Sequence, residues 1–228
     1  MTEMEIKEQI CDVCHKMWQL GWVAANDGNV SVKLPDGNFI CTPTGISKSF
    51  ITPEKLVKIN AQGEILEAND GYRPSSEMKM HMRCYELRDD VGAVVHAHPP
   101  AATGFAVAHL PMDRYIMIEA VISLGSVPLT PFGVPSTKEV PDAIAPYLPD
   151  HDAMLLENHG AVTVGADLCT AYYRMETLEL WAKNRTERPS AGRGKRNLRK
   201  EYRPLAGASE IRQGDGPPPG YRHYRKNK

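Results

Sequence analysis

Apolar residues recur at steps of three and four near the start of the chain, which is the spacing of one face of a helix. The residues of this stripe are Ile6, Ile10, Val13, Cys14, Met17 and Leu20. Gly21 follows the stripe and is a favourable helix end. The pattern predicts an amphipathic helix over residues 4–21.

The next part of the chain changes from a helical period to alternation. Apolar and polar residues alternate over 30–34 and 39–42, on either side of the turn-forming sequence Pro-Asp-Gly-Asn at 35–38. A second pair of short segments, 56–60 and 64–67, flanks another turn. These patterns predict antiparallel strands over most of the first third.

Helices and strands then alternate. The sequence Pro-Ser-Ser-Glu at 74–77 predicts the start of a helix that runs to about Arg88, with serines able to cap free N–H groups. The later expected elements are a strand over 91–95, a helix over 101–108, a segment over 116–124, a strand near Val127, a helix over 137–148, strands over 153–156 and 161–164, and a helix over 168–184. The order predicts an α/β fold: one three-layer domain with a mainly antiparallel central sheet flanked by helices.

The composition changes after Arg185. Residues 188–228 are basic and rich in proline and glycine, with few large apolar side chains. Such a segment cannot build a core of its own. We therefore predict a folded domain over 1–187 and a basic C-terminal tail over 188–228, either solvated or folded over a neighbouring active site.

Composition and charge exclude several classes of protein. Among the 228 residues, 42% are hydrophobic and 24% charged, and the net charge of -1 gives no reason to expect nucleic acid or membrane as a partner. No apolar run is long enough to span a bilayer, and the first residues do not form a leader sequence. Five scattered cysteines suggest reduced thiols. We expect a cytoplasmic globular protein.

Three histidines are candidate metal ligands. His96 and His98 stand two residues apart at the end of an apolar strand, so both side chains point to the same face. His159 lies between two expected strands, beside Gly160, which allows the backbone to pass close to another group. Neutral imidazoles suit zinc or a similar ion with positions open to substrate oxygens. From the residues alone, a metal site and hydrogen-bonded core histidines both stay possible.

Glu77 is the candidate acid. In the first turn of a helix, a carboxylate either complements the helix dipole or, beside a metal, transfers protons. The hydroxyl groups and free N–H groups of that helix start favour phosphate, and polar turns at 28–31 and 42–45 add donors and close backbone approach. The candidate phosphate ligands are Gly28, Asn29, Thr44, Gly45, Ser75 and Ser76.

Five short motifs, in order, resemble those of the class II aldolase and adducin family. They are Gly-Asn-Val-Ser at 28–31, Thr-Pro-Thr-Gly at 42–45, Pro-Ser-Ser-Glu at 74–77, Val-Val-His-Ala-His at 94–98 and Asn-His-Gly at 158–160. Each motif alone is weak, but their order and spacing over about residues 5–185 are specific. The resemblance favours a metal site at the three histidines.

The resemblance implies a role for each matching position. His96, His98 and His159 would hold a divalent metal, with zinc first and manganese or cobalt as alternatives, and Glu77 would be the catalytic acid and base. The phosphate of a sugar phosphate would be held by the positions matching Asn29, Thr44, Gly45, Ser75 and Ser76. The resemblance also implies a homotetramer with active sites at subunit interfaces. These remain analogies, because a shared fold does not set the function.

The resemblance further implies an activity. Aldolases of the family carry Ser-Ser-Glu where the epimerases usually carry Ser-Ser-Asp, so Glu77 favours an aldolase, an aldehyde-lyase of carbohydrate metabolism that releases dihydroxyacetone phosphate and an aldehyde from a ketose 1-phosphate. Met117 replaces a tyrosine of the fuculose enzyme, and Tyr115 and Glu119 are the nearby candidates for the aldehyde end. The expected substrates are L-fuculose 1-phosphate or a 5-deoxy or 5-methylthio pentulose 1-phosphate.

Three alternatives stay open. Two are enzymes on the same scaffold, one like L-ribulose-5-phosphate 4-epimerase and one like a methylthioribulose-phosphate dehydratase. The third is an adducin-like module without catalysis. The presence of all three histidines and Glu77 argues against the third.

Overall fold

A computed structural model describes residues 1–69 and 71–186, so the predicted tail over 188–228 lies outside the described residues. The chain opens with helix α1 (Glu3–Gln19), which starts with Thr2 and Glu5 in a capping box. Its buried stripe contains Ile6, Ile10, Cys11, Val13, Cys14 and Met17. Leu20 was expected on this stripe but is 48% exposed, because it lies at the C-cap, where the chain turns away before Gly21.

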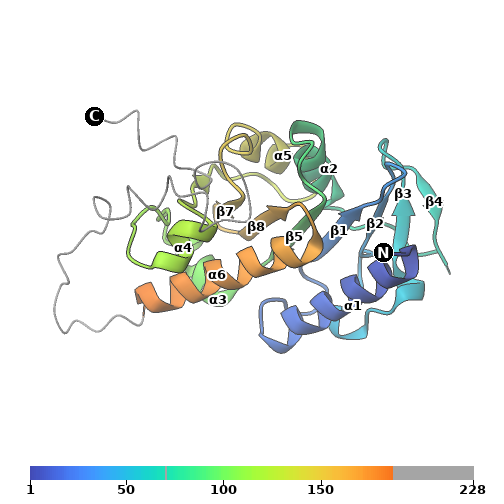
Figure 1. The fold of residues 1–228 in the computed structure, drawn as a ribbon, viewed down its shortest axis with the longest axis horizontal. Helices are drawn as coiled ribbons and strands as arrows, with labels where there is room; N and C mark the ends of the chain where they lie inside the picture. Colours follow the sequence, from blue (N-terminus) through green and yellow to red (C-terminus); the bar gives the residue numbers. More distant parts are fainter. Residues whose placement is uncertain (70, 187–228) are drawn as a thin grey trace.

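Eight strands form one sheet (Figure 1), in the order β4-β3-β2-β1-β5-β8-β7-β6. Their bounds are β1 (Asn29–Lys33), β2 (Phe39–Cys41), β3 (Val57–Ile59), β4 (Ile65–Glu67), β5 (Ala93–Ala97), β6 (Leu129–Thr130), β7 (Ala153–Leu156) and β8 (Gly160–Gly165). All neighbouring strands are antiparallel except β6 and β7. The predicted mainly antiparallel sheet is confirmed. Val127 itself forms only an isolated bridge with Met112, and the strand begins two residues later.

Helices cover both faces of the sheet (Figure 1), which confirms the predicted three layers. On one face, α2 (Met78–Leu87) and α5 (Glu139–Ile144) contribute to a core that contains Val94 and Val162. On the other, α1, α3 (Pro100–Val107) and α6 (Leu168–Thr186) share a core with Val30 and Val95, and α4 (Ile118–Ser123) packs on α6. Two short 3₁₀ helices, Lys48–Phe50 and Pro53–Lys55, lie between β2 and β3.

Helix α5 is shorter than the predicted 137–148. It begins at Glu139, whose N–H donates to the side chain of Thr137, and it ends at Ile144. Pro146 stands two residues beyond that end and has no N–H to continue the helix. The sequence pattern therefore identified the helix but overestimated its length.

Strands β5 and β8 bring the expected site segments together. Both strands are buried along their whole length, and the end of β5 pairs with the start of β8 through Ala97 and Ala161. On the other side of β5, Asn29 pairs with His96. The sheet thus places the segments around 28, 96 and 159 together at one end of its central strands, although they are far apart in sequence.

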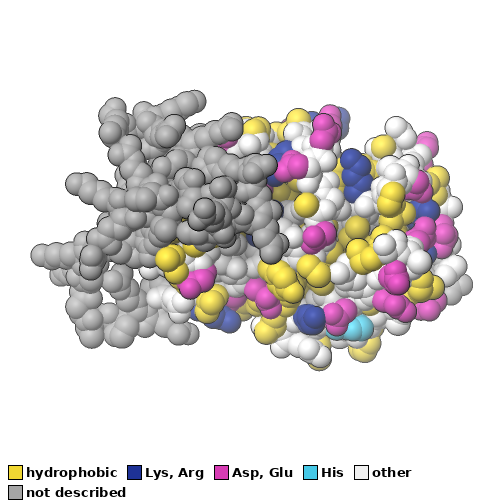
Figure 2. Space-filling model, in the orientation of Figure 1, with side chains coloured by type: hydrophobic (Ala, Val, Ile, Leu, Met, Phe, Trp, Pro, Cys, Tyr) yellow, Lys and Arg dark blue, Asp and Glu magenta, His cyan; other side chains and the backbone are white. Residues whose placement is uncertain are grey.

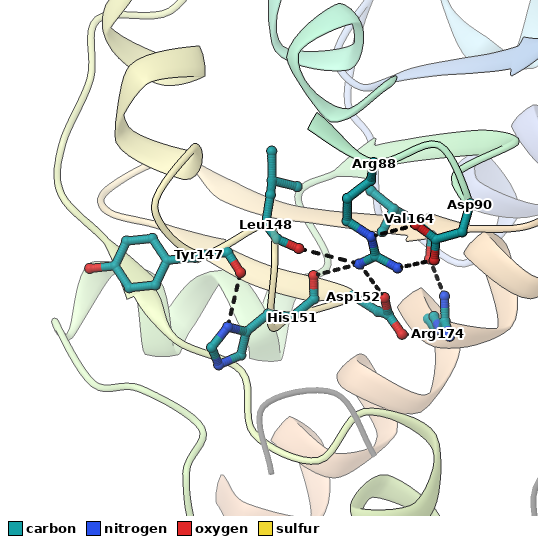
Figure 3. Close-up of polar contacts among 8 residues, drawn as sticks. All are labelled: Arg88, Asp90, Tyr147, Leu148, His151, Asp152, Val164 and Arg174. Atoms are coloured by element: carbon teal, nitrogen blue, oxygen red, sulfur yellow. Dashed lines mark hydrogen bonds and ion pairs between the residues drawn. The ribbon is translucent and has the colours of Figure 1, made fainter. Parts of the chain in front are cut away.

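A buried ionic network joins α2, the loop before β7 and α6 (Figure 3). Arg88 donates to the carbonyl oxygen of His151 at 3.2 Å and to Asp152 Oδ1 at 2.6 Å, while Arg174 contacts Asp152 Oδ2 at 2.6 Å. The Asp152 side chain is only 4% exposed. His151 is 3% exposed, and its Nδ1 donates to the carbonyl oxygen of Tyr147.

Replacing Asp152 with alanine is expected to lower the free energy of unfolding by about 2–4 kcal/mol, because two guanidinium groups would lose their shared buried carboxylate. Urea unfolding would measure the change. Asp142→Ala is the matched control, since that carboxylate also pairs with an arginine but is 64% exposed and should change stability by about 1 kcal/mol or less. Equal effects in the two variants would contradict a structural role for the network.

Charges of both signs are mixed on the face of the molecule that Figure 2 draws. Figure 2 shows acidic and basic side chains interspersed over the described part of one face, in keeping with the net charge of -1. No helix in the described ranges combines the length and apolarity needed to cross a membrane.

Candidate metal centre and active site

Strand β5 directs two histidines toward one point. The ring of His96 donates through Nδ1 to the carbonyl oxygen of Ala161 at 2.9 Å, so the lone pair of this neutral imidazole is on Nε2. His98 lies just beyond the strand, and its Nε2 is 3.2 Å from Nε2 of His96. Two ring nitrogens this close are better suited to bind one metal ion together than to act as two separately hydrogen-bonded core histidines.

His159 completes the group from the turn between β7 and β8. Its ring centroid lies 4.7 Å from that of His96 and 5.1 Å from that of His98. One nitrogen from each of the three rings lies within 4.8 Å of the others. Among the described residues, His159 Nδ1 has no hydrogen-bond partner, although it is buried. The predicted convergence of the three histidines is therefore found in the structure.

Burial keeps these imidazoles neutral. It lowers the pKa of His96 and His98, and that of His159 to about 4, while the carboxylates of Asp27 and Glu77 act in the opposite direction on the pKa of His98. Neutral imidazoles carry the lone pairs that a metal requires. The donor set and the unpaired Nδ1 of His159 fit a divalent ion held by His96, His98 and His159.

Gly160 makes the close approach of β8 to His98 possible. A Cβ at this position would lie 2.5 Å from Cδ2 of the His98 ring and 2.6 Å from the carbonyl oxygen of Ala97. The expected close passage of the backbone at Gly160 is therefore present, and the group that it passes is the candidate ligand His98.

Gly160→Ala is expected to weaken metal binding by at least about tenfold and to destabilise the protein by about 1–3 kcal/mol, because either His98 or the strand must move. Metal content after dialysis and urea unfolding would measure the two effects. Gly104→Ala on α3 is the control, since nothing lies within 4 Å of its added Cβ and alanine favours a helix. Unchanged metal affinity in Gly160→Ala would show that the contact does not position His98.

Acid is expected to destabilise the metal-free protein as the pH falls from about 6.5 toward 4. The unfolded chain has histidine pKa values of about 6.5, whereas burial lowers the pKa of His81 to about 3 and that of His159 to about 4. In this pH range the unfolded state binds more protons than the native state does. The free energy of unfolding therefore decreases as the pH is lowered, by about 1.4 kcal/mol per pH unit for the fully buried His81. Urea titrations at pH 7, 6 and 5 would measure this slope, and a flat profile would contradict it.

Glu77 lies at the start of α2, close to the histidines. It is the N-cap residue rather than part of the first turn, because the helix begins at Met78. The Glu77 N–H donates to Ser75 Oγ at 3.3 Å, but the N-cap is Glu77 and makes no side-chain capping hydrogen bond, so the predicted capping of the helix by the serines is not found. The Glu77 side chain is 9% exposed and accepts hydrogen bonds from the N–H and the hydroxyl of Ser136.

Two further residues of this region, Asp27 and Ser136, were not predicted from the sequence. Ser136, 59 residues from Glu77 in sequence, also has its hydroxyl 2.8 Å from Ser76 Oγ, from which it can accept, and has a φ of 68°, which is rare outside glycine. Asp27 lies 3.5 Å from Nδ1 of His98. The only sequence signal for Asp27 was its place directly before the motif at 28–31, and Ser136 had none.

The expected phosphate segments lie side by side. The carbonyl oxygen of Thr42 accepts from the N–H of Ser75 at 3.1 Å, and the N–H of Thr44 donates to the carbonyl oxygen of Arg73 at 2.9 Å. The hydroxyl of Thr42 also accepts from the N–H of Val30 at 3.2 Å, which ties these turns to β1. The structure thus gathers the segments that carry Gly28, Asn29, Thr44, Gly45, Ser75 and Ser76.

Gly28 has a second, structural reason to be glycine. Its φ is 71°, and a Cβ would lie 2.5 Å from Cγ1 of Val23 and 3.0 Å from the carbonyl oxygen of His96. A side chain here would therefore clash with Val23, press on the backbone of His96 and strain the local backbone. The role of Gly28 in holding phosphate stays a prediction.

The two candidates for the aldehyde end are placed differently from each other. Tyr115 is 4% exposed in the segment before α4, whereas Glu119 is exposed in the first turn of that helix. Glu119 does not belong to the group of converging histidines. A role for either residue in binding the aldehyde stays a prediction.

The chain is similar in sequence to known proteins of one family. Residues 8–186 match the model of the class II aldolase and adducin N-terminal domain. The 3-oxo-tetronate 4-phosphate decarboxylase of Escherichia coli strain K12 is 33% identical over 190 residues, which cover 80% of this chain and 86% of that protein. The L-fuculose phosphate aldolase of Escherichia coli O6:H1 is 33% identical over 182 residues, covering 80% and 83%.

Solved structures agree with these matches. YgbL from Escherichia coli has a TM-score of 0.76 at 30% identity, covering 83% of this chain and 92% of that one. The L-fuculose-1-phosphate aldolase of Thermus thermophilus has a TM-score of 0.71 at 31% identity, covering 80% and 93%. Because the family model matches most of the chain and these relatives are at least 30% identical to it, the chain belongs to the class II aldolase and adducin family and is an aldolase-type enzyme.

Proposed function

We propose that the protein is a metal-dependent aldolase that cleaves a ketose 1-phosphate to dihydroxyacetone phosphate and an aldehyde. The observation that carries this proposal is the convergence of three neutral imidazoles beside a carboxylate. His96, His98 and His159 each contribute a nitrogen within 4.8 Å of the others, and Glu77 is near enough to raise the pKa of His98 against the effect of burial.

The reaction needs a base for one proton, a place for negative charge and a source of one proton. In cleavage of a ketose 1-phosphate, a base takes the proton of the C4 hydroxyl, for which Tyr115 and Glu119 are the candidates at the aldehyde end. The C3–C4 bond then breaks to release the aldehyde and leaves an electron pair on C3 that is shared with the carbonyl oxygen at C2. A divalent ion held by the histidines would supply Lewis-acid stabilisation of that charge. Glu77 would deliver a proton to C3, with its carboxylate oriented by the N–H and hydroxyl of Ser136.

The phosphate of the substrate would occupy the gathered turns. Thr44, Gly45, Ser75 and Ser76 lie on two turns joined by backbone hydrogen bonds, next to Asn29 at the start of β1. Hydroxyl, amide and backbone N–H groups in such turns are suited to bind phosphate oxygens. Anchoring at this end would hold the reacting carbons near Glu77 and the histidines.

We also propose zinc as the native ion, because three imidazoles and open positions suit it, and a cytoplasmic homotetramer with active sites at its interfaces. Elemental analysis of the protein as purified and its mass in solution would test the ion and the assembly. Manganese or cobalt in place of zinc, or a monomer with full activity, would contradict these two points.

A second candidate is decarboxylation of 3-oxo-tetronate 4-phosphate, the reaction named for a relative that is 33% identical. Loss of CO₂ from this acid leaves the same electron pair beside the same carbonyl group, and its protonation also yields dihydroxyacetone phosphate. One observation favours it: the decarboxylation needs no base at a C4 hydroxyl, and the position aligned with the tyrosine of the fuculose enzyme is Met117 here, whose side chain cannot act as a base.

One panel of substrates separates the candidates. The metal-loaded protein is incubated with L-fuculose 1-phosphate, a 5-deoxy and a 5-methylthio pentulose 1-phosphate, L-ribulose 5-phosphate and 3-oxo-tetronate 4-phosphate, and dihydroxyacetone phosphate is followed by its reduction in a coupled assay. Release from a ketose 1-phosphate supports the aldolase. Release from the tetronate alone, with CO₂, would establish the decarboxylase instead. An epimer without dihydroxyacetone phosphate would refute both.

A further inference from the structure

A chain of buried hydrogen bonds runs from α2 to Asn29 on β1. The hydroxyl of Tyr85 lies 2.8 Å from Ser31 Oγ, which lies 2.7 Å from Nδ1 of His81. Nε2 of His81 lies 2.6 Å from Oδ1 of Asn29. His81 and Ser31 have no exposed surface, and Asn29 and Tyr85 are 3% and 5% exposed. None of the steps proposed above uses His81, Ser31 or Tyr85.

The proton positions in this chain follow from one constraint. Complete burial lowers the pKa of His81 to about 3, so its ring is neutral and carries one N–H. Because Asn29 Oδ1 can only accept, that hydrogen is on Nε2, and Nδ1 then accepts from the hydroxyl of Ser31. Ser31 in turn accepts from Tyr85, whose phenol stays protonated because burial raises its pKa.

The direction of these hydrogen bonds, from Tyr85 toward Asn29, determines which group of the Asn29 carboxamide can contact a further partner. The oxygen is engaged by His81, so the NH₂ group is the part of the amide that is left for other partners. Asn29 pairs with His96 on the neighbouring strand β5 and directly follows Gly28. It therefore lies at the end of β1 where the turns of Thr44 and Ser75 meet. A phosphate oxygen accepts hydrogen bonds only, so an amide that presented its oxygen there would repel it.

We propose that His81 is a positioning residue that holds the Asn29 amide with its NH₂ group toward the substrate phosphate. The inference rests on the proposed function, in which Asn29 contacts that phosphate. Ser31 donates to Nδ1 of His81 and accepts from Tyr85, so the chain supports the tautomer of His81 that donates to Asn29. If His81 only filled space, an apolar side chain of similar shape could replace it with little loss of stability. Here, the hydrogen bonds of His81 specify one orientation of the Asn29 amide.

A matched pair of variants tests the proposal. Glutamine at position 81 places an amide nitrogen near the position of Nε2 and can still donate to Asn29, whereas asparagine reaches only the position of Nδ1 and cannot. The dissociation constant of inorganic phosphate is measured for the metal-bearing protein by calorimetry. We expect His81→Gln to bind within about threefold of wild type, and both His81→Asn and Asn29→Ala to bind about tenfold more weakly, the loss expected for a hydrogen bond to a charged group.

The outcomes separate the two proposals. If Asn29→Ala binds phosphate weakly but His81→Asn binds as tightly as His81→Gln, the positioning role is refuted and the phosphate site stands. If Asn29→Ala binds as wild type does, the contact of Asn29 with phosphate is wrong and the role of His81 fails with it. A measurement on the unaltered protein covers variants that do not fold: ¹⁵N shifts of the histidine rings should show His81 protonated on Nε2, and protonation on Nδ1 would overturn the proposal.

Discussion

Replacing Glu77 with glutamine is expected to abolish proton transfer while the protein stays folded and keeps its metal. In D₂O, dihydroxyacetone phosphate should exchange one hydrogen of its hydroxymethyl carbon for deuterium on the wild-type protein, which NMR follows without knowledge of the aldehyde partner. Glutamine keeps an oxygen to accept from Ser136 but cannot move a proton. We expect the exchange rate to fall by about 10²–10⁴-fold, the usual contribution of general acid and base catalysis.

The control for this variant is Glu139→Gln. Glu139 is an exposed carboxylate that accepts from the N–H of Val134, in the same loop that contacts Glu77, and it should change the exchange rate by less than about twofold. If Glu77→Gln exchanged as fast as wild type, Glu77 would be reduced to a partner of Ser136 and of the start of α2. Equal loss in both variants would point to the loop rather than to proton transfer.

Replacing His96 with alanine is expected to remove the metal and, with it, all activity. His96 is 1% exposed, its ring is aligned by the carbonyl oxygen of Ala161, and its Nε2 points at Nε2 of His98. With one of three protein ligands lost, we expect the affinity for zinc to fall by more than about 100-fold, because even a lost partner of a ligand costs 10–100-fold. Metal content after dialysis against a weak chelator measures this.

A second readout does not depend on activity. Because metal binds only the folded state, added zinc should raise the Tm of wild type and leave that of His96→Ala unchanged. His109→Ala is the control, since His109 is an exposed histidine outside the converging group and should keep the metal and the Tm shift. Equal metal occupancy in His96→Ala and wild type would refute the site.

Local patterns predicted most elements of this fold, because their signals are short-range. The apolar stripe of α1 and the alternation around the turn at 35–38 reflect which side chains face the core, and both elements are present. The errors fall where a few residues outweigh the pattern. Helix α5 stops before Pro146, and Leu20 is exposed because the chain turns away at the C-cap of α1.

The candidate site likewise contains residues that could be predicted from the sequence and residues that could not. His96 and His98 could be paired from sequence, because a strand repeats every two residues, and five ordered motifs added His159 and Glu77. Asp27 and Ser136 could not be found, since their contacts depend on loops that meet across the fold. The direction of the hydrogen bonds that reach Asn29 likewise depends on how α2 lies over β1.

The sequence by itself therefore determined the family and identified three histidines and Glu77 as candidates, because residue types and short spacings specify which side chains are available to bind a metal or move a proton. Only the tertiary structure decided that these histidines converge, that burial keeps them neutral, and that Gly160 must lack a side chain for His98 to fit. The physical reason is range: periodicity reports the environment of one segment, whereas ligand geometry and pKa depend on the pairing of β5 with β8 and on the burial that this pairing produces.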